Sequence, residues 1–230
     1  MTANITLDWY FDFVSPFAYL QSTQLDRFAK RARLRCRPVL FAGLLKHWGN
    51  VGPAEIAPKR QWTFEQVAWI AHSQGIGLEL PPMHPFVPLP LLRLSIAAGN
   101  DPEVVQRLFA FVWRDGHLPT ERDAFAALLD ELGIAPAALE TPEVKQALRT
   151  NTDEAISAGV FGVPTAVIEG ERYWGFDATP MILARLAGDP FFASDALRAA
   201  RALPEGVQRP GIGATPTEAV NPSAAGRPSP

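Results

Sequence analysis

The stretch YFDFVSPFAYL, residues 10–20, joins an apolar strand to an amphipathic helix at the Ser15-Pro16 step. Proline is favoured at the first helical position and serine at the position before it, so a helix is predicted to begin here. A hydroxyl at a helix N-terminus lies beside unpaired backbone N–H groups and the positive end of the helix dipole, and both favour an anion. The residues leave two interpretations of Ser15 open: a plain N-cap, or a side chain that faces the sulfur of a small anionic thiol.

Regular elements are predicted on both sides of this stretch. Alternating and helical spacing of apolar residues predicts a strand, a helix and a second strand at 5–13, 15–32 and 34–41. Strands return only after Pro164, in the run Gly162-Val163-Pro164-Thr165. The C-terminal pattern is a hairpin with strands at 165–168 and 172–174, then a helix at 179–187 and a helical segment at 191–202.

The middle of the chain has helical patterns interrupted by prolines. Helices are predicted at 59–74, 89–99, 103–115, 121–132 and 142–158. Asp101 and Thr141 each precede a proline in the way that an N-cap precedes the first helical residue. Residues 80–90 hold five prolines, which predicts a stiff, extended connection.

The order β-α-β, helical segment, β-β-α predicts an α/β fold with a large all-helical insertion. The two parts of the sheet domain are expected at 1–42 and 159–203, and the inserted helical domain at 43–158. The tail, 204–230, is rich in proline and glycine and has few large apolar groups, so it is expected to be disordered. Clefts between such domains are preferred ligand sites.

Composition excludes several function classes. The 230 residues carry a net charge of −3, which favours binding neither to nucleic acid nor to an anionic membrane. No apolar run is long enough to cross a bilayer and the start of the chain is not that of a signal peptide, so a soluble cytoplasmic protein is expected. Cys36 is the only cysteine, and its strand-like surroundings predict a buried thiol without a disulfide partner. The four histidines lack metal-ligand spacing, so no metal site is expected.

Four segments together carry a resemblance to a known family. They are YFDFVSPFAYL at 10–20, KHWGNVGP at 46–53, VFGVPT at 160–165 and YWGFD at 173–177. In this order they resemble the thioredoxin-like proteins of the Dsb-type superfamily, and within it the 2-hydroxychromene-2-carboxylate isomerases and the related kappa-class glutathione transferases. The resemblance extends from about residue 5 to 200 and implies a thioredoxin-like domain, glutathione as cofactor and a homodimer.

The resemblance also implies roles for individual residues. Ser15 would face the sulfur of glutathione, and a hydroxyl bond together with the helix dipole would favour its thiolate. Val163 would precede a cis proline and present its backbone to the cysteinyl part. The segment Trp174, Gly175, Phe176 and Asp177 would bind the γ-glutamyl end, with the carboxylate of Asp177 suited to an ammonium group. A serine N-cap, a proline at a strand start and a solvated turn carboxylate are the structural alternatives.

On the substrate side, the resemblance places Lys46, Asn50 and His84 near a small aromatic molecule. The structural alternative for Lys46 is a solvated helix residue. The chain also departs from the family pattern at three places. Phe176 and Ala178 replace a small polar residue and an arginine, Glu55-Ile56 replaces an Asn-Arg pair, and His84 replaces a tyrosine. These departures suggest a different or looser substrate.

Three function hypotheses follow from the resemblance. The first is a glutathione-dependent cis–trans isomerase that acts on an aromatic, unsaturated α-keto acid. The second is a kappa-like glutathione transferase, which would use the same thiolate but consume it. The third is a catalytically silent thioredoxin-fold binding protein.

Overall fold

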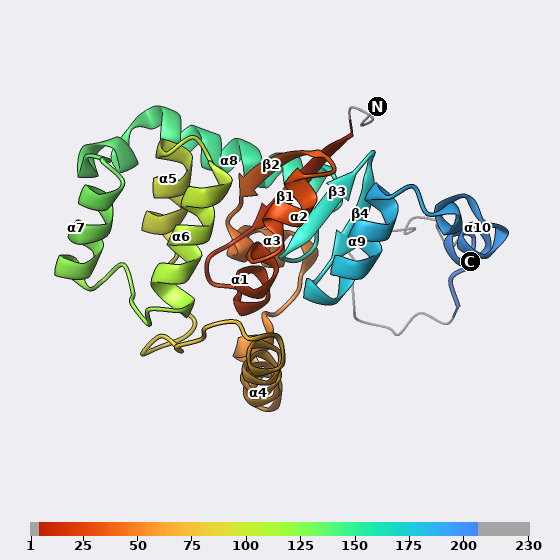
Figure 1. Cartoon of the computed structure of the whole chain (residues 1–230), viewed down its shortest axis with the longest axis horizontal. Coiled ribbons are helices and arrows are strands. Elements are labelled where there is room, and N and C mark those ends of the chain that lie inside the picture. Colours follow the sequence, from red (N-terminus) through yellow and green to blue (C-terminus); the bar gives the residue numbers. More distant parts are fainter. Residues whose placement is uncertain (1–4, 207–230) are drawn as a thin grey trace, which may run out of the picture. The chain divides into compact units, whose positions relative to one another are not determined.

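The computed structural model describes residues 5–206, and its strands form one four-stranded mixed sheet (Figure 1). The strands are β1 (Thr6–Phe11), β2 (Arg33–Pro38), β3 (Thr165–Ile168) and β4 (Glu171–Trp174). They lie in the order β2-β1-β3-β4, with β1 parallel to β2 and antiparallel to β3. The first strand of the sequence is therefore central, and it joins the two ends of the sheet domain. The predicted α/β class is confirmed.

Two short helices follow β1, where one continuous helix was predicted. They are α1 (Pro16–Ser22) and α2 (Leu25–Ala29). The break follows from two hydroxyl side chains that bond to the backbone: Ser22 Oγ donates to Tyr19 O at 2.6 Å, and Thr23 Oγ1 donates to Leu20 O at 2.8 Å. Such local bonds compete with the helical pattern and favour its end.

The second strand also differs from its prediction, since it ends at Pro38 rather than near residue 41. The helix α3 (Phe41–Trp48) begins where the strand was expected to continue. The cause is a bond across the chain: Oδ2 of Asp12 accepts the N–H of Phe41 at 2.9 Å and so satisfies an unpaired donor in the first turn of α3.

The inserted segment is helical, as predicted. Its further elements are η1 (Pro53–Glu55), α4 (Ala57–Gln74), α5 (Leu89–Ala97), α6 (Pro102–Trp113), α7 (Arg122–Glu131), η2 (Pro136–Glu140) and α8 (Pro142–Ser157). Both predicted caps are present: Asp101 accepts the N–H groups of Glu103 and Val104, and Thr141 accepts that of Val144. Among residues 5–206, no helix combines the length and the apolar character that crossing a membrane requires.

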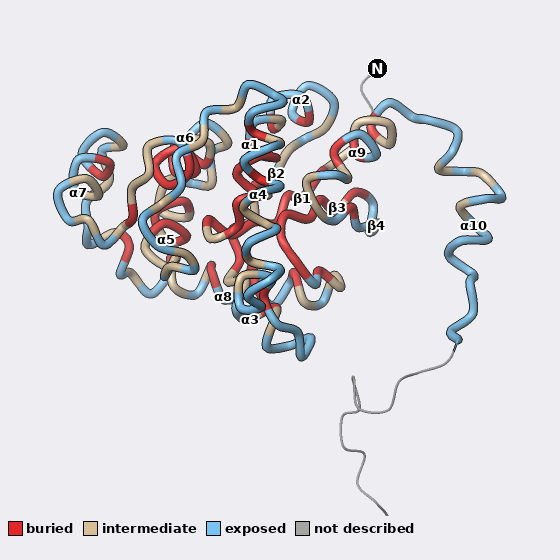
Figure 2. The backbone as a smooth tube through the Cα atoms, turned by 90° about the horizontal axis from the view of Figure 1, so that it is seen from below, coloured by how far each residue is buried: buried red, intermediate tan, exposed pale blue. Residues whose placement is uncertain are grey.

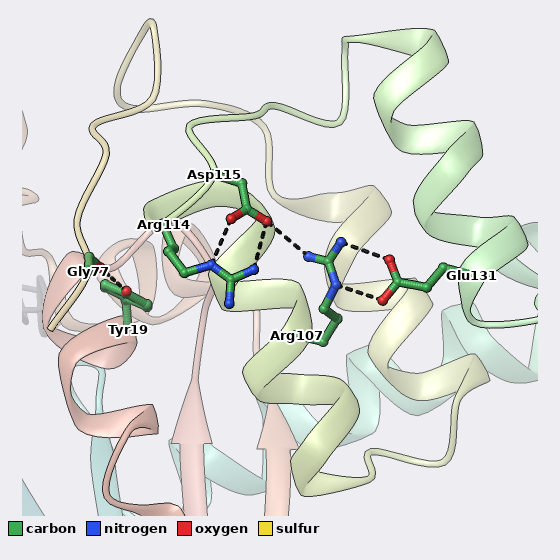
Figure 3. A network of polar contacts seen from close by, with 6 residues as sticks. All are labelled: Tyr19, Gly77, Arg107, Arg114, Asp115 and Glu131. Carbon is green, nitrogen blue, oxygen red and sulfur yellow. Dashed lines mark hydrogen bonds and ion pairs between the residues drawn. The ribbon is translucent and has the colours of Figure 1, made fainter.

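A polar network joins α6 to α7 (Figure 3). Arg107 donates two bonds to the carboxylate of Glu131, at 2.7 and 2.8 Å, and also contacts Asp115 at 3.3 Å. Arg114 donates two further bonds to Asp115, at 2.7 and 3.1 Å. A bidentate guanidinium–carboxylate pair fixes direction as well as distance, so the network sets how α7 lies against α6.

Aromatic side chains of β1 pack directly on α6 to form the main core. The rings of Trp9 and Phe11 stack at 4.7 Å, and Phe109 of α6 lies 4.6 Å from Phe13. Trp113 Nε1 donates to Phe13 O at 2.9 Å, so the buried indole N–H is satisfied. Figure 2 shows the buried backbone running from the sheet strands into α1 and α6. Sheet and insertion thus share a continuous apolar interior.

The C-terminal part of the sheet ends in a tight hairpin and a helix. Glu169 and Gly170 both have positive φ, 51° and 82°, which is the backbone of the two-residue turn that twisted hairpins prefer. After β4 come η3 (Phe176–Ala178) and α9 (Thr179–Leu186).

The chain divides into two compact units, the first ending at Phe192 and the second beginning at Ala193. At this junction lies η4 (Pro190–Ala193), and the second unit holds α10 (Asp195–Arg201), which Ser194 caps by accepting the N–H of Leu197. The tail predicted to be disordered lies outside the described residues from 207 onward.

Candidate functional site

Ser15 occupies the N-cap of α1, as the Ser-Pro step predicts. Its backbone is extended, with φ −90° and ψ 114°, and its Oγ accepts the N–H of Ala18 at 3.2 Å. Pro16 takes the first helical position. Ser15 therefore acts as an N-cap, and this position places its hydroxyl among the unpaired N–H groups at the start of the helix.

The same hydroxyl faces a segment 148 residues away in sequence. Ser15 Oγ donates to Val163 O at 3.3 Å, and the Val163-Pro164 peptide bond is cis, as hypothesised. An O–H···O bond is usually 2.7–2.8 Å long, so this one is weak. The serine proton can turn towards a better acceptor at little cost.

The end of β4 lies beside this contact. Gly175 N donates to Pro164 O at 2.9 Å, which brings the Trp174–Asp177 segment next to the cis proline. Gly175 has φ 94°, a conformation that favours glycine. A Cβ on Gly162 would lie 2.6 Å from Nε1 of Trp174, so the indole sits directly on that glycine.

Exposed aromatic rings surround the Val163-Pro164 step. Trp174 is 55% exposed and lies 5.1 Å, ring to ring, from Phe161, which is 40% exposed. Trp48, at the end of α3, donates from Nε1 to Val160 O at 2.9 Å. Large apolar groups left open beside a polar contact are typical of ligand sites.

Asp12 is a site residue that sequence reasoning missed. It is buried, 1% exposed, and its carboxylate accepts the N–H groups of Val14, at 3.0 Å, and Phe41. Burial raises the pKa of Asp12 to about 7, although the backbone N–H bonds oppose the shift. The signal was present in the sequence as an acidic residue between Phe11 and Phe13, and a side chain in such a run needs hydrogen-bond donors.

His84 comes to the Ser15 loop from the proline-rich connection. Its Nε2 lies 2.8 Å from Val14 O, and because a carbonyl only accepts, Nε2 carries the proton. Burial lowers the pKa of His84, which favours the neutral ring. Nδ1 is buried without a hydrogen-bond partner, and Arg60 donates to the backbone oxygen of His84 at 2.7 Å. The predicted substrate residue therefore contacts the chain next to Ser15.

Lys46 and Asn50, the other two predicted substrate residues, are exposed at the end of α3. Asn50 Oδ1 accepts the N–H of its neighbour Val51 at 2.9 Å. Within residues 5–206, no hydrogen bond or ion pair joins either side chain to Ser15. The structure brings Ser15, Val163, Gly175 and His84 together and leaves Lys46 and Asn50 at the surface.

Cys36 lies outside this site. It is buried on β2, and burial raises the pKa of its thiol to about 12. A thiol in that state is a poor nucleophile at neutral pH, which agrees with the predicted packing role. In the described part of the chain, no three His, Cys, Asp or Glu side chains group closely enough to hold a metal ion.

Comparisons with known proteins agree with this architecture. A model of the DSBA-like thioredoxin domain matches residues 6–187. The 2-hydroxychromene-2-carboxylate isomerase of Pseudomonas putida is 31% identical over 186 residues, which are 76% of this chain and 91% of that protein. Glutathione S-transferase kappa 1 of Rattus norvegicus is 26% identical over 206 residues, 80% of this chain and 91% of that protein.

A solved structure shows the same likeness in three dimensions. A 2-hydroxychromene-2-carboxylate isomerase structure superposes with a TM-score of 0.69 at 25% identity, covering 86% of this chain and 98% of that one. A probable DsbA oxidoreductase of Streptomyces coelicolor superposes with a TM-score of 0.60 at 14% identity, covering 81% of this chain and 91% of that one, which concerns the fold alone.

Proposed function

This chain belongs to the DSBA-like thioredoxin domain family, and from that premise we propose that it is a glutathione-dependent cis–trans isomerase of an aromatic, unsaturated α-keto acid. The observation that carries the proposal is the Ser15 hydroxyl, held at the start of α1 and turned towards Val163 O by a weak bond. The distant homology to isomerases and kappa-class transferases supports the reaction class.

In this proposal Ser15 holds the sulfur of glutathione. Its proton leaves Val163 O for the sulfur, while Ser15 Oγ keeps its bond to the N–H of Ala18. Both the hydroxyl bond and the helix dipole stabilise a thiolate over a thiol, so the pKa of the bound thiol falls. No protein cysteine takes part, since Cys36 is buried outside the site.

Glutathione would supply a nucleophile that adds to the conjugated double bond of the substrate and later leaves unchanged. Such chemistry would let the substrate rotate about that bond with no net consumption of glutathione. Trp48, Phe161 and Trp174 offer exposed aromatic surface for a planar substrate.

A titration of reduced glutathione into the protein tests the proposal. Ultraviolet absorbance near the thiolate band should rise at neutral pH in the wild type and stay flat in Ser15→Ala. Saturable binding without that signal would instead support a binding protein, and no binding at millimolar glutathione would overturn the proposal.

A kappa-like transferase is the second candidate, because kappa-class relatives match the chain as fully as the isomerases do. The two reactions share their first step and differ in the fate of glutathione. Mass spectrometry after many turnovers separates them: an isomerase returns all glutathione as free thiol, and a transferase converts it stoichiometrically into a thioether. A cytoplasmic location and a homodimer remain predictions.

A further inference from the structure

The loop between β1 and α1, residues 12–15, is held by two parts of the chain. Within the loop, Ser15 N donates to Asp12 O at 3.1 Å, and Asp12 Oδ1 accepts the N–H of Val14 at 3.0 Å. The carbonyls of Phe13 and Val14 accept instead from side chains of the inserted helical segment. The conformation of the loop that carries the Ser15 hydroxyl therefore depends on the insertion as well as on the loop itself.

Two ring nitrogens of the insertion donate to these carbonyls. Trp113 Nε1 donates to Phe13 O at 2.9 Å, and His84 Nε2 lies 2.8 Å from Val14 O. The two rings are neighbours, with 5.8 Å between their centroids. The peptide between Val14 and Ser15 is planar, and both of its polar atoms are bonded, so its orientation is fixed from two sides.

The imidazole of His84 is itself packed between aromatic rings. Its ring lies 5.1 Å from that of Phe64 on α4 and 6.2 Å from that of Phe86, each edge to face. The guanidinium of Arg60, which donates to the backbone oxygen of His84, lies 5.1 Å from the centre of the Phe64 ring. A ring packed in this way keeps its direction, so the N–H of Nε2 stays aimed at Val14 O.

The protonation state of His84 agrees with a donor role for Nε2. Nδ1 is buried and has no hydrogen-bond partner among the described residues, so a proton there would lack an acceptor. Burial also lowers the pKa of His84. The neutral ring with its proton on Nε2 is therefore the favoured form, and this form donates to Val14 O.

The direction of the Val14 carbonyl matters for an anion beside Ser15. Ser15 has an extended backbone, with φ −90° and ψ 114°, and this conformation aims its Oγ at the start of α1. Without a donor, the part-buried Val14 oxygen would turn towards water, and the peptide that it shares with Ser15 would turn with it. The hydroxyl would then lose its fixed direction.

We propose that His84 is a positioning residue for Ser15: by donating to Val14 O it fixes the peptide that precedes the serine, and so keeps the Ser15 hydroxyl directed at the sulfur of bound glutathione. The inference rests on the proposed function, because it assumes that glutathione binds at Ser15. It gives the inserted segment a part in stabilising the thiolate. His84 acts through the backbone of Val14, and this role needs no contact between His84 and the reacting atoms.

The test measures the pKa of the thiol of bound glutathione by following thiolate absorbance against pH. His84→Phe keeps an aromatic ring but removes the donor, and it should raise this pKa by about one unit, which corresponds to an about tenfold weaker stabilisation of the thiolate. His84→Gln has an amide nitrogen at the same number of bonds from Cα as Nε2 of histidine, so it should restore most of the wild-type pKa. Both variants should bind S-methylglutathione, which has no ionisable sulfur, as tightly as the wild type does.

His117→Phe is the matched control. His117 is a second half-buried histidine of the insertion, and its ring lies 5.4 Å from that of Phe111. Its Nδ1 lies 2.8 Å from Glu121 Oε2, and no printed bond joins it to the Ser15 loop in the described part of the chain. The same loss of a ring nitrogen should here leave the pKa of the bound thiol unchanged.

Three results would overturn the inference. The first is an unchanged thiol pKa in His84→Phe, and the second is an equal rise in His84→Phe and His84→Gln, because the donor would then not be the cause. The third is a parallel loss of S-methylglutathione binding, which would mean that His84 only supports the fold. If the wild type shows the Ser15-dependent thiolate band in any of these cases, only this inference fails. If the wild type binds no glutathione, or binds it without that band, the proposed function fails and the inference fails with it.

Discussion

Replacing the buried Asp12 with asparagine should change how the free energy of unfolding depends on pH. In the folded protein its pKa is about 7, against an ordinary value of 3.8, because burial penalises the charged form. The folded state therefore holds the Asp12 proton more tightly than the unfolded chain does. The contribution of Asp12 to the free energy of unfolding is therefore fully present below about pH 4, and it is lost as the pH rises through 7.

The magnitude follows from the size of the shift. Each pKa unit corresponds to about 1.4 kcal/mol, so a rise from 3.8 to about 7 corresponds to about 4 kcal/mol over the full range. Only part of this free energy is lost in the pH range that the assay covers: between pH 5 and pH 8 the loss is about 2.5 kcal/mol. This calculation concerns the change with pH, so it does not depend on how well the asparagine amide replaces the bonds to Val14 and Phe41.

The assay is urea unfolding at several pH values between 5 and 8. The wild type should lose about 2.5 kcal/mol more than Asp12→Asn across that range. Asp26→Asn removes one exposed carboxylate of α2 and serves as the charge-matched control, and it should follow the wild type. Parallel curves for the wild type and Asp12→Asn would refute the reasoning, because they would mean that Asp12 stays ionised throughout this range.

Three further predictions concern buried or closely packed side chains. Cys36 should resist iodoacetamide at pH 8 in the folded protein and react once urea unfolds it, as followed by mass spectrometry; rapid native alkylation would contradict its burial. Gly162→Ala should displace the indole of Trp174, lowering stability by about 1 kcal/mol and changing tryptophan fluorescence, and an unchanged spectrum would count against the close contact. Gln21→Ala should cost about 3 kcal/mol in urea unfolding, because the buried Trp9 Nε1, 2.8 Å from Gln21 Oε1, loses its acceptor; a cost below 1 kcal/mol would argue against that bond.

Features that depend on neighbouring residues were predictable from the sequence. The N-cap at Ser15, the caps at Asp101 and Thr141, and the hairpin around Glu169-Gly170 each arise from local backbone chemistry, and the structure has all of them. The resemblance supplied the cis bond before Pro164 and the thioredoxin-like fold, which spacing alone does not yield.

Features that depend on distant partners were not predictable in this way. The bond of Asp12 to Phe41 lies at the start of α3, a helix that was not predicted, and the second strand ends before it; nothing near Phe41 in the sequence indicates this bond. Likewise, the contact of His84 with Val14 depends on the path of the proline-rich connection. No local pattern in a single sequence indicates which distant residues form these pairs.

The central position of β1 has a consequence for how the protein is made. Its neighbour β3 lies about 150 residues later in the chain, so at roughly 5–20 residues per second the ribosome needs on the order of 10–30 s to supply it. During that interval one side of an apolar, aromatic strand is a free hydrogen-bonding edge. The nascent chain is therefore an expected client for chaperones that cover such edges, and a message truncated before codon 163 would yield a product without the Ser15–Val163 contact.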